Sequence, residues 1–229
     1  MKLIQVWAEI CIIVSSPHSF FIIIKAGADL NAANNELDRP LHLAAGVGNL
    51  EVLRVLLDNG ADLGARGWLE NTALHVAAQA AQVREKDQKT HWNHVTQVSI
   101  IHELLQRGLA FDVTNGHGEH PIHLAAGSFG DVEDIRHVEI LLEAGVNIKK
   151  SRTHEGCTAA HYAAKSGSPE TLRLLLDAEC PVTKAKMNEE LRWYTVHVGD
   201  TLLELTAKSG CPIKGALVLD RIMAARCVI

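Results

Sequence analysis

The stretch DRPLHLAAGVGNLEVLRVLLDNGAD, residues 38–62, has the pattern of two short helices joined by a turn. Pro40 suits a first helical turn, where a missing N–H costs nothing, and the apolar face after it ends in two alanines. Gly48 then turns the chain, and apolar residues recur at helical spacing up to Gly60, where a helix end commonly needs a positive φ. This second apolar stripe consists of Val52, Leu53, Leu56 and Leu57.

The same pattern recurs along the chain, and its histidine marks each copy. Starting from His42, the motifs TALH, HPIH and TAAH place histidines at His75, His123 and His161, and TLLELTAKSG carries Glu204 in that position. The spacings are 33, 48, 38 and 43 residues, so the period is 33 with insertions of 15, 5 and 10. An alanine pair follows two residues after each of the four histidines. Because one helix pair cannot bury its own stripe, neighbouring copies must stack to be stable.

A 33-residue period with this histidine, an alanine pair, a glycine turn, a leucine-rich second helix and a closing Gly-Ala-Asp resembles the ankyrin repeat. The resemblance covers essentially the whole chain. It implies an all-α ankyrin-repeat solenoid of stacked helix-turn-helix units joined by β-hairpin-like loops, called fingers. We expect a single domain over residues 1–229. Its approximate repeats are 1–33 (a degenerate cap), 34–66, 67–114 (with the 15-residue insertion between its helices), 115–152, 153–195 and 196–229 (a degenerate cap with a finger extension before it).

Several residues have expected structural roles in the repeat. Thr72 and Thr158 stand where a hydroxyl would satisfy a free amide at a helix N-terminus. By resemblance to the family, the histidines bond backbone groups and threonine hydroxyls at the base of the helix pair; these are His42, His75, His123 and His161. Leu37, Glu70 and Glu179 depart from the pattern, since each replaces a usual glycine.

Histidine clusters also raise the question of a metal-dependent enzyme. The clusters are His91 with His94, and His117, His120 and His123 with Glu119. Zinc needs three or four converging ligands, and neither cluster supplies a complete set, so we predict no metal and no cofactor. Signatures of nucleotide binding, nucleophilic catalysis or zinc proteolysis do not occur in the sequence. The sequence therefore predicts a protein that is not an enzyme, with metal-dependent catalysis as a disfavoured alternative.

Charge and cysteine usage narrow the class of partner and the compartment. The net charge of −5, with no basic block, disfavours nucleic-acid binding. The apolar runs near the N-terminus are interrupted by Glu9 and Pro17, so no membrane association is expected, and a degenerate first repeat is favoured over a signal peptide. Five scattered cysteines predict reduced thiols in an intracellular protein, in the cytoplasm with the nucleus as the alternative. We expect a monomer.

The resemblance implies a non-catalytic scaffold that binds a partner protein through a concave surface of fingers and first helices. Aromatic side chains in the nonrepeating loops are the candidate contacts, because tryptophan and tyrosine are enriched at binding hot spots. They are Trp68, Trp193, Tyr194 and Trp92. The alternative for each ring is that it folds back over its own loop. An alternative function is a targeting or substrate-recognition segment of a larger multidomain protein whose activity lies elsewhere.

Overall fold

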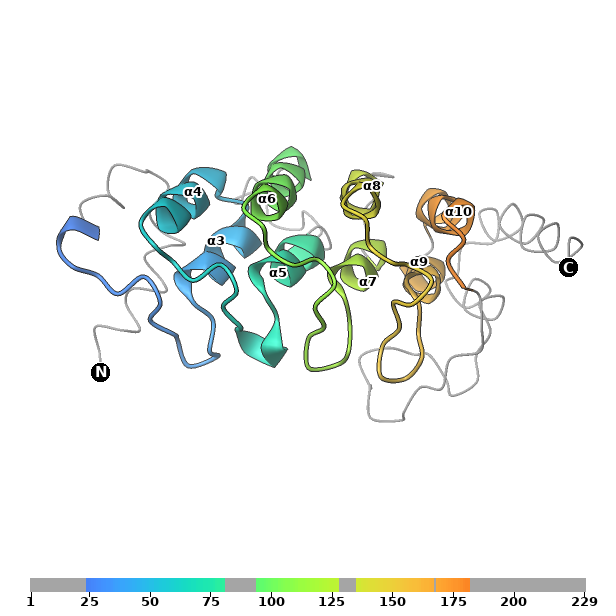
Figure 1. The fold of residues 1–229 in the computed structure, drawn as a ribbon, viewed down its shortest axis with the longest axis horizontal. Coiled ribbons are helices and arrows are strands. Elements are labelled where there is room, and N and C mark those ends of the chain that lie inside the picture. The colour runs from blue at the N-terminus through green and yellow to red at the C-terminus, as the bar shows by residue number, and fades with distance from the viewer. Residues whose placement is uncertain (1–23, 81–93, 128–134, 167, 182–229) are drawn as a thin grey trace, which may run out of the picture. The chain divides into compact units, whose positions relative to one another are not determined.

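The computed structural model describes residues 24–80, 94–127, 135–166 and 168–181 (Figure 1). The chain divides into two compact units, Met1–Gly116 and His117–Ile229, called below the N-terminal and the C-terminal unit. In both units, the described part of the chain folds into pairs of short antiparallel helices with long loops between the pairs.

Two helix pairs pack together in the N-terminal unit. The first is α3 (Pro40–Val47) with α4 (Leu50–Asp58), and the second is α5 (Ala73–Ala80) with α6 (His94–Gln106). α3 packs against α5, and α4 packs against α6, so the first helices form one layer and the second helices another (Figure 1). A 3₁₀ turn, η1 (Trp68–Glu70), forms the tip of the finger between the pairs.

The C-terminal unit repeats this arrangement. Its pairs are α7 (Pro121–Ala126) with α8 (Arg136–Glu143), and α9 (Ala159–Ser166) with α10 (Pro169–Asp177). The first helices α7 and α9 pack on each other, and α8 and α10 pack on α7 and α9 respectively.

The core of both units is aliphatic, as the composition predicts. Alanine pairs of the first helices are buried, which lets neighbouring helices approach closely. Leucine and isoleucine side chains of the second helices fill the space between the layers, and each buried one contributes about 1.5–3 kcal/mol. The fully buried set includes Leu53, Leu56, Ile100, Leu104, Leu141, Leu172 and Leu175.

The ends of the helices follow from local sequence. Pro40 and Pro121 occupy the first turn of α3 and α7. The side chain of Asn49 accepts a hydrogen bond from the Val52 amide at 3.0 Å and so caps α4. Gly48 ends α3 in the left-handed region at φ 79°, and its helix-ending counterpart after α4, Gly60, has φ 91°.

An ion-pair network joins the second helices of the N-terminal unit. Glu103 of α6 accepts hydrogen bonds from Arg54 of α4 and from Arg107, both at 2.9 Å. Burial alone would raise the pKa of Glu103, but the two arginines outweigh it and hold that pKa below its usual value. Arg107 also pairs with Asp58 at 2.7 Å. Partly exposed pairs of this kind contribute about 0–1 kcal/mol each, so the network supports a packing that the aliphatic core already determines.

The all-α fold class is confirmed for the part of the chain that the structure describes, in which no strand occurs. One helix pair lies in each of the four central expected repeats, although the repeat boundaries themselves stay predictions. In three fingers a backbone N–H donates to the carbonyl four residues later: Gly67 to Asn71 at 2.8 Å, and Asn34 to Asp38 and Thr153 to Cys157 at 2.9 Å.

The 15-residue insertion, most of the first repeat and all of the last one lie outside the described residues. None of the helices described above combines the length and hydropathy that crossing a bilayer requires.

Candidate binding surface

The repeat histidines lie at the base of the fingers and hold the start of each first helix. In two repeats, threonine supplies both a backbone and a side-chain contact: His75 Nδ1 accepts from the Thr72 amide at 3.2 Å and lies 2.8 Å from its hydroxyl. His161 makes the same contacts with Thr158, at 3.2 and 2.8 Å. His42 and His123 accept from the amides of Arg39 and His120 at 3.1 and 3.0 Å.

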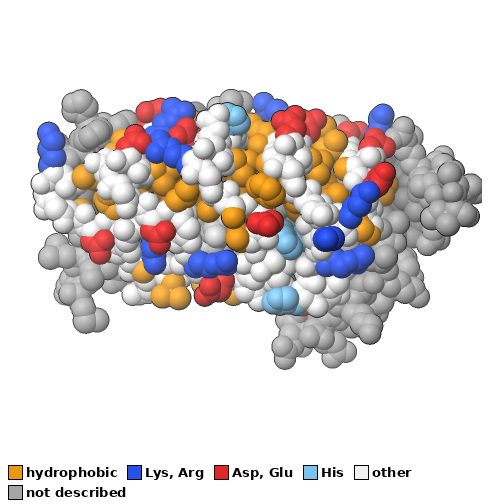
Figure 2. Space-filling view, viewed as in Figure 1, with side chains coloured by type: hydrophobic (Ala, Val, Ile, Leu, Met, Phe, Trp, Pro, Cys, Tyr) orange, Lys and Arg blue, Asp and Glu red, His pale blue; other side chains and the backbone are white. Residues whose placement is uncertain are grey.

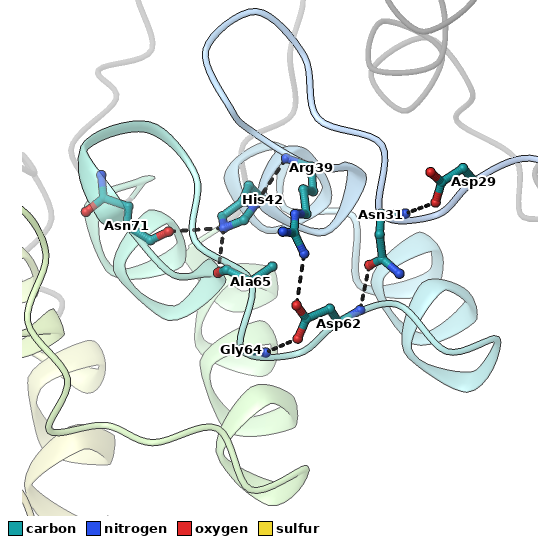
Figure 3. A network of polar contacts seen from close by, with 8 residues as sticks. All are labelled: Asp29, Asn31, Arg39, His42, Asp62, Gly64, Ala65 and Asn71. Carbon is teal, nitrogen blue, oxygen red and sulfur yellow. Dashed lines mark hydrogen bonds and ion pairs between the residues drawn. The ribbon is translucent and has the colours of Figure 1, made fainter.

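The second ring nitrogen of His42 reaches into the next finger. Because Nδ1 accepts from a backbone N–H, Nε2 carries the proton, and it lies 3.1 Å from the carbonyl oxygens of both Ala65 and Asn71 (Figure 3). Burial lowers the pKa of His42 despite these hydrogen bonds and the nearby Asp38. The neutral ring thus ties one repeat to the following finger.

The side chain of His123 is fully buried, and its pKa is far below the usual value of a histidine. Burial, and then the neighbouring His120, lower the pKa of His123 to about 3. Tyr162 packs edge-on against its ring with 5.4 Å between centroids, and the Tyr162 hydroxyl donates to Glu119 at 2.5 Å. An imidazole that stays neutral and enclosed suits a structural role. Across the described ranges, His, Cys, Asp and Glu side chains form no group of three that could hold a metal ion.

A polar network occupies the base of the first fingers (Figure 3). Arg39, which stands in the threonine position of its repeat, pairs with Asp62 at 2.9 Å. Asp62 also accepts from the Gly64 amide at 3.1 Å, and its own amide donates to Asn31 at 2.8 Å. Asp62 belongs to the Gly-Ala-Asp segment of the repeat, so this acidic residue connects one finger base to the next.

Neighbouring fingers of the N-terminal unit are also tied to each other at their tips. The Trp68 amide donates to the carboxylate of Asp38 at 2.9 Å, and the Gly116 amide donates to the Leu69 carbonyl at 2.8 Å. The side chain of Asn115 donates to that of Asn71 at 3.0 Å, in a buried position. These contacts join three consecutive fingers and fix the backbone of the middle one.

The tip of the middle finger has no space for a side chain where it approaches the preceding one. A Cβ added to Gly67 would lie 2.2 Å from Asp38 Oδ1 and 3.2 Å from the His42 ring. Arg66, on the same finger, donates to the carbonyls of Glu70 and Thr114 at 3.0 and 2.6 Å. The fingers are therefore closely packed backbone structures, not loose loops.

Large apolar side chains are exposed on these tips. Leu37 is 61% exposed, Trp68 55% and Leu69 36%, and they are the exposed large hydrophobic residues of the described part of the chain. Glu36 and Glu70 lie beside them in sequence and are exposed as well. We call these five residues the finger-tip surface. Figure 2 shows a small group of hydrophobic side chains at the edge of the molecule where the N-terminal fingers end.

Backbone conformation at the finger-tip surface is strained. Leu37, Leu69 and Glu70 have φ values of 68°, 53° and 58°, in the left-handed region that favours glycine. Gly118 and Gly156 have φ of 74° and 79°, at the positions that correspond to Leu37 and Glu70 in the next two fingers. The sequence identifies Leu37 and Glu70 as residues that replace a usual glycine, but it does not identify Leu37 and Leu69 as exposed apolar residues.

Of the aromatic candidates from the sequence, the structure places Trp68 on the finger-tip surface with its side chain exposed. Trp92, Trp193 and Tyr194 lie outside the described residues. The motif residues Gly48, Gly60, Thr72 and Thr158 lie at helix ends and finger bases, where they shape the repeat and not its tip.

Comparison with known proteins identifies the family of the chain. The family model described as ankyrin repeats (3 copies) matches residues 10–85 and 93–186, which is more than half of the chain. Among curated proteins, the chain is 29% identical over 168 residues to an E3 ubiquitin-protein ligase, XBAT33, of Arabidopsis thaliana, covering 64% of this chain and 30% of that protein.

Two further relatives have names that differ from the first and from each other. Inversin of Canis lupus familiaris is 24% identical over 184 residues, covering 70% of this chain and 17% of inversin. Protein glp-1 of Caenorhabditis elegans is 28% identical over 195 residues, covering 82% of this chain and 13% of that protein. The chain therefore spans less than a third of the length of each of these three relatives.

Proposed function

Because the chain belongs to the ankyrin-repeat family, we propose that it is a non-catalytic scaffold that binds a partner protein through its fingers and first helices. Ankyrin repeats are generally protein–protein interaction modules, and a solenoid of this kind offers an extended surface rather than an enclosed catalytic pocket. The partner contacts that we propose begin with the finger-tip surface of the N-terminal unit.

One observation carries this proposal: the exposed large apolar side chains of the described residues gather on two adjacent finger tips. Scattered exposed leucines are ordinary on protein surfaces, whereas a clustered apolar patch marks an interaction site more often. Trp68 is the kind of residue that dominates binding free energy, because it buries a large area at small cost in side-chain entropy.

The stability of the fold does not explain why non-glycine residues such as Leu37 occupy the left-handed positions at the finger tips. A left-handed backbone costs a non-glycine residue about 1–2 kcal/mol, and Leu37 combines this cost with an exposed aliphatic side chain. Glycine at that position, as in the corresponding Gly118 and Gly156, would avoid both. Strained residues of this kind persist where they serve a function, and here the available function is contact with a partner.

Trp92, Trp193 and Tyr194 remain further proposed contacts, because they lie in nonrepeating loops of the sequence. The net charge of −5 supports a protein partner over a nucleic acid. We also propose a monomeric protein of the cytoplasm or nucleus, on the basis of its scattered cysteines and its family.

Lysate capture with a matched pair of variants tests the proposed function. The tip variant combines Leu37→Asn, Trp68→Ser and Leu69→Asn; asparagine tolerates the left-handed backbone, so folding should be retained. The control combines Glu51→Gln, His102→Asn and Arg173→Gln, three exposed residues of second helices. Quantitative mass spectrometry should show partner recovery reduced at least about fivefold by the tip variant and unchanged by the control. Equal recovery by both would refute the proposed site.

A second candidate function is a targeting or substrate-recognition segment of a larger protein. The observation that favours it is the coverage of the relatives, since this chain matches between 13% and 30% of their lengths. One of them is named as an E3 ubiquitin-protein ligase. Immunoblotting of the endogenous protein tests this: a band near 24.9 kDa would contradict it, and a much larger one would support it.

A further inference from the structure

Acidic residues flank the exposed apolar residues of the finger-tip surface in the sequence, Glu36 before Leu37 and Glu70 after Leu69. Glu36 and Glu70 are exposed, and within the described ranges neither side chain makes a hydrogen bond or an ion pair. Asp38 adds a third carboxylate, already bonded to the Trp68 amide. The basic residue at this site, Arg66, is directed to the backbone carbonyls of Glu70 and Thr114. Carboxylates therefore outnumber cations here, and two of them are available to a ligand.

The exposed indole of Trp68 adds a preference among cations. A guanidinium group stacks on the face of an indole and can at the same time donate two parallel hydrogen bonds to a carboxylate. An ammonium group is a compact and strongly hydrated charge. It can lie over the indole face, but it cannot donate two parallel hydrogen bonds to a carboxylate in the way that a guanidinium group does. Leu37 and Leu69 supply apolar area beside these polar groups.

The surface is also held in place before binding. Hydrogen bonds from Trp68 to Asp38 and from Gly116 to Leu69 fix the backbone of the tips. The backbone at Gly67 lies so close to Asp38 that an added Cβ would be 2.2 Å from its Oδ1. A ligand that binds a preorganised surface loses less free energy to ordering than one that binds a flexible loop.

From these three features we propose that the finger-tip surface binds an arginine-containing apolar segment of the partner protein. Arginine side chains of the segment pair with Glu36 and Glu70 and stack on Trp68, while its leucine or aromatic side chains cover Leu37 and Leu69. The carboxylates make an anionic membrane surface a poor occupant, because like charges repel. This inference rests on the proposed function, and it names the chemistry of the segment that the scaffold would recognise.

Four fluorescein-labelled peptides of equal length, measured by anisotropy with the full chain, test the proposal. The first alternates arginine and leucine; the others replace arginine by lysine, arginine by glutamate, or leucine by serine. We expect the arginine peptide to bind most tightly, with affinity at least about tenfold above the glutamate and serine peptides and above the lysine peptide by a smaller factor. Equal binding of the arginine and glutamate peptides would overturn the proposal.

Paired variants then locate the binding. Glu36→Gln with Glu70→Gln should weaken arginine-peptide binding by about fivefold for each carboxylate and flatten its salt dependence, while leaving the glutamate peptide unaffected or better bound. The control, Glu51→Gln with Glu143→Gln, removes the same charge from exposed positions on second helices and should change nothing. An equal loss in both variants would show that net charge alone attracts the peptide, which contradicts a built site.

A phage library of random peptides separates this inference from the proposed function. Enriched peptides that lose binding to the Trp68→Ser variant but show no excess of arginine would leave the proposed function standing and overturn the inference. Enriched peptides that are rich in arginine and depend on Trp68 support both. Enrichment that no finger-tip variant affects contradicts both, as does preferential binding of the surface to vesicles of phosphatidylserine or to a second copy of the chain.

Discussion

The carboxylate of Asp38 accepts a hydrogen bond from the Trp68 amide at 2.9 Å, so the tip of one finger is anchored by the preceding finger. The bond ties the backbone of Trp68, whose aromatic side chain is 55% exposed, to a residue 30 positions earlier. The exposed indole therefore projects from a fixed support. Trp68 can be both fixed in position and exposed, because the hydrogen bond to Asp38 uses its backbone amide and leaves its side chain free of that contact.

Gly67→Ala should destabilise the N-terminal unit. The new methyl group would lie 2.2 Å from Asp38 Oδ1, so Asp38 must move and its bond to Trp68 must weaken or break. We expect the free energy of unfolding to fall by about 1–3 kcal/mol, measured by urea denaturation. Gly64→Ala is the matched control, since its nearest atom would be 3.7 Å away, and it should change stability by less than about 0.5 kcal/mol.

The double variant Asp38→Ala with Gly67→Ala tests the cause of that loss. Because Asp38→Ala removes the atom that the new methyl group would strike, the two changes should be non-additive, with a coupling of about 1 kcal/mol or more. Strict additivity would mean that the cost of Gly67→Ala arises elsewhere, for example against His42.

Leu37→Gly and Glu70→Gly should each stabilise the chain. Both residues hold positive φ values, 68° and 58°, and both side chains are exposed, so glycine relieves the backbone without removing buried contacts. We expect a gain of about 0.5–1 kcal/mol in each case, seen as a higher melting temperature. Glu36→Gly, at a neighbouring residue without positive φ, should instead cost about 0.5–1 kcal/mol. A loss of stability in Leu37→Gly would contradict the strain.

The repeat architecture was predictable from sequence because it depends on a periodic pattern of small and aliphatic residues. The four histidines and their alanine pairs marked the copies, and the first helices of the described part lie where that register places them. Trp68 could be named from its place in a nonrepeating finger. The exposure of Leu37 and Leu69 could not be predicted, since it depends on how adjacent fingers approach each other. The hydrogen bond between Asp38 and Trp68 could not be predicted from the sequence either, because it joins residues of different repeats through a backbone amide.

Cys157 and Cys180 should resist alkylation in the folded protein. Both side chains are buried, and burial raises the pKa of each thiol, that of Cys157 to about 11. Because the thiolate is the reactive form, little of Cys157 is available at pH 8 even if the reagent enters. Iodoacetamide treatment followed by peptide mapping should leave both residues unmodified in native protein and modify both after denaturation. Rapid native modification of Cys157 would contradict its enclosure.

The free energy of unfolding should fall as the pH drops below 6.5, the ordinary pKa of histidine, and His123 should cause part of this fall. Burial and the neighbouring His120 lower the pKa of His123 from 6.5 to about 3 in the folded state. Between these values the unfolded chain binds a proton that the folded chain does not, so the free energy of unfolding decreases with falling pH, by about 1.4 kcal/mol per pH unit for a full proton. This contribution is complete above pH 6.5 and is lost towards pH 3.

Urea denaturation at several pH values from 7 to 5 measures that slope, and His123→Gln should reduce it by up to one proton. The variant should also be less stable at pH 7, because it loses the Nδ1 contact with the His120 amide, so the slope and not the absolute stability is the decisive quantity. His102→Gln, an exposed residue of α6, serves as the control and should leave the slope unchanged. If His123→Gln kept the full wild-type slope, His123 would not contribute to the loss of stability at low pH. That result would contradict the lowered pKa of this buried histidine.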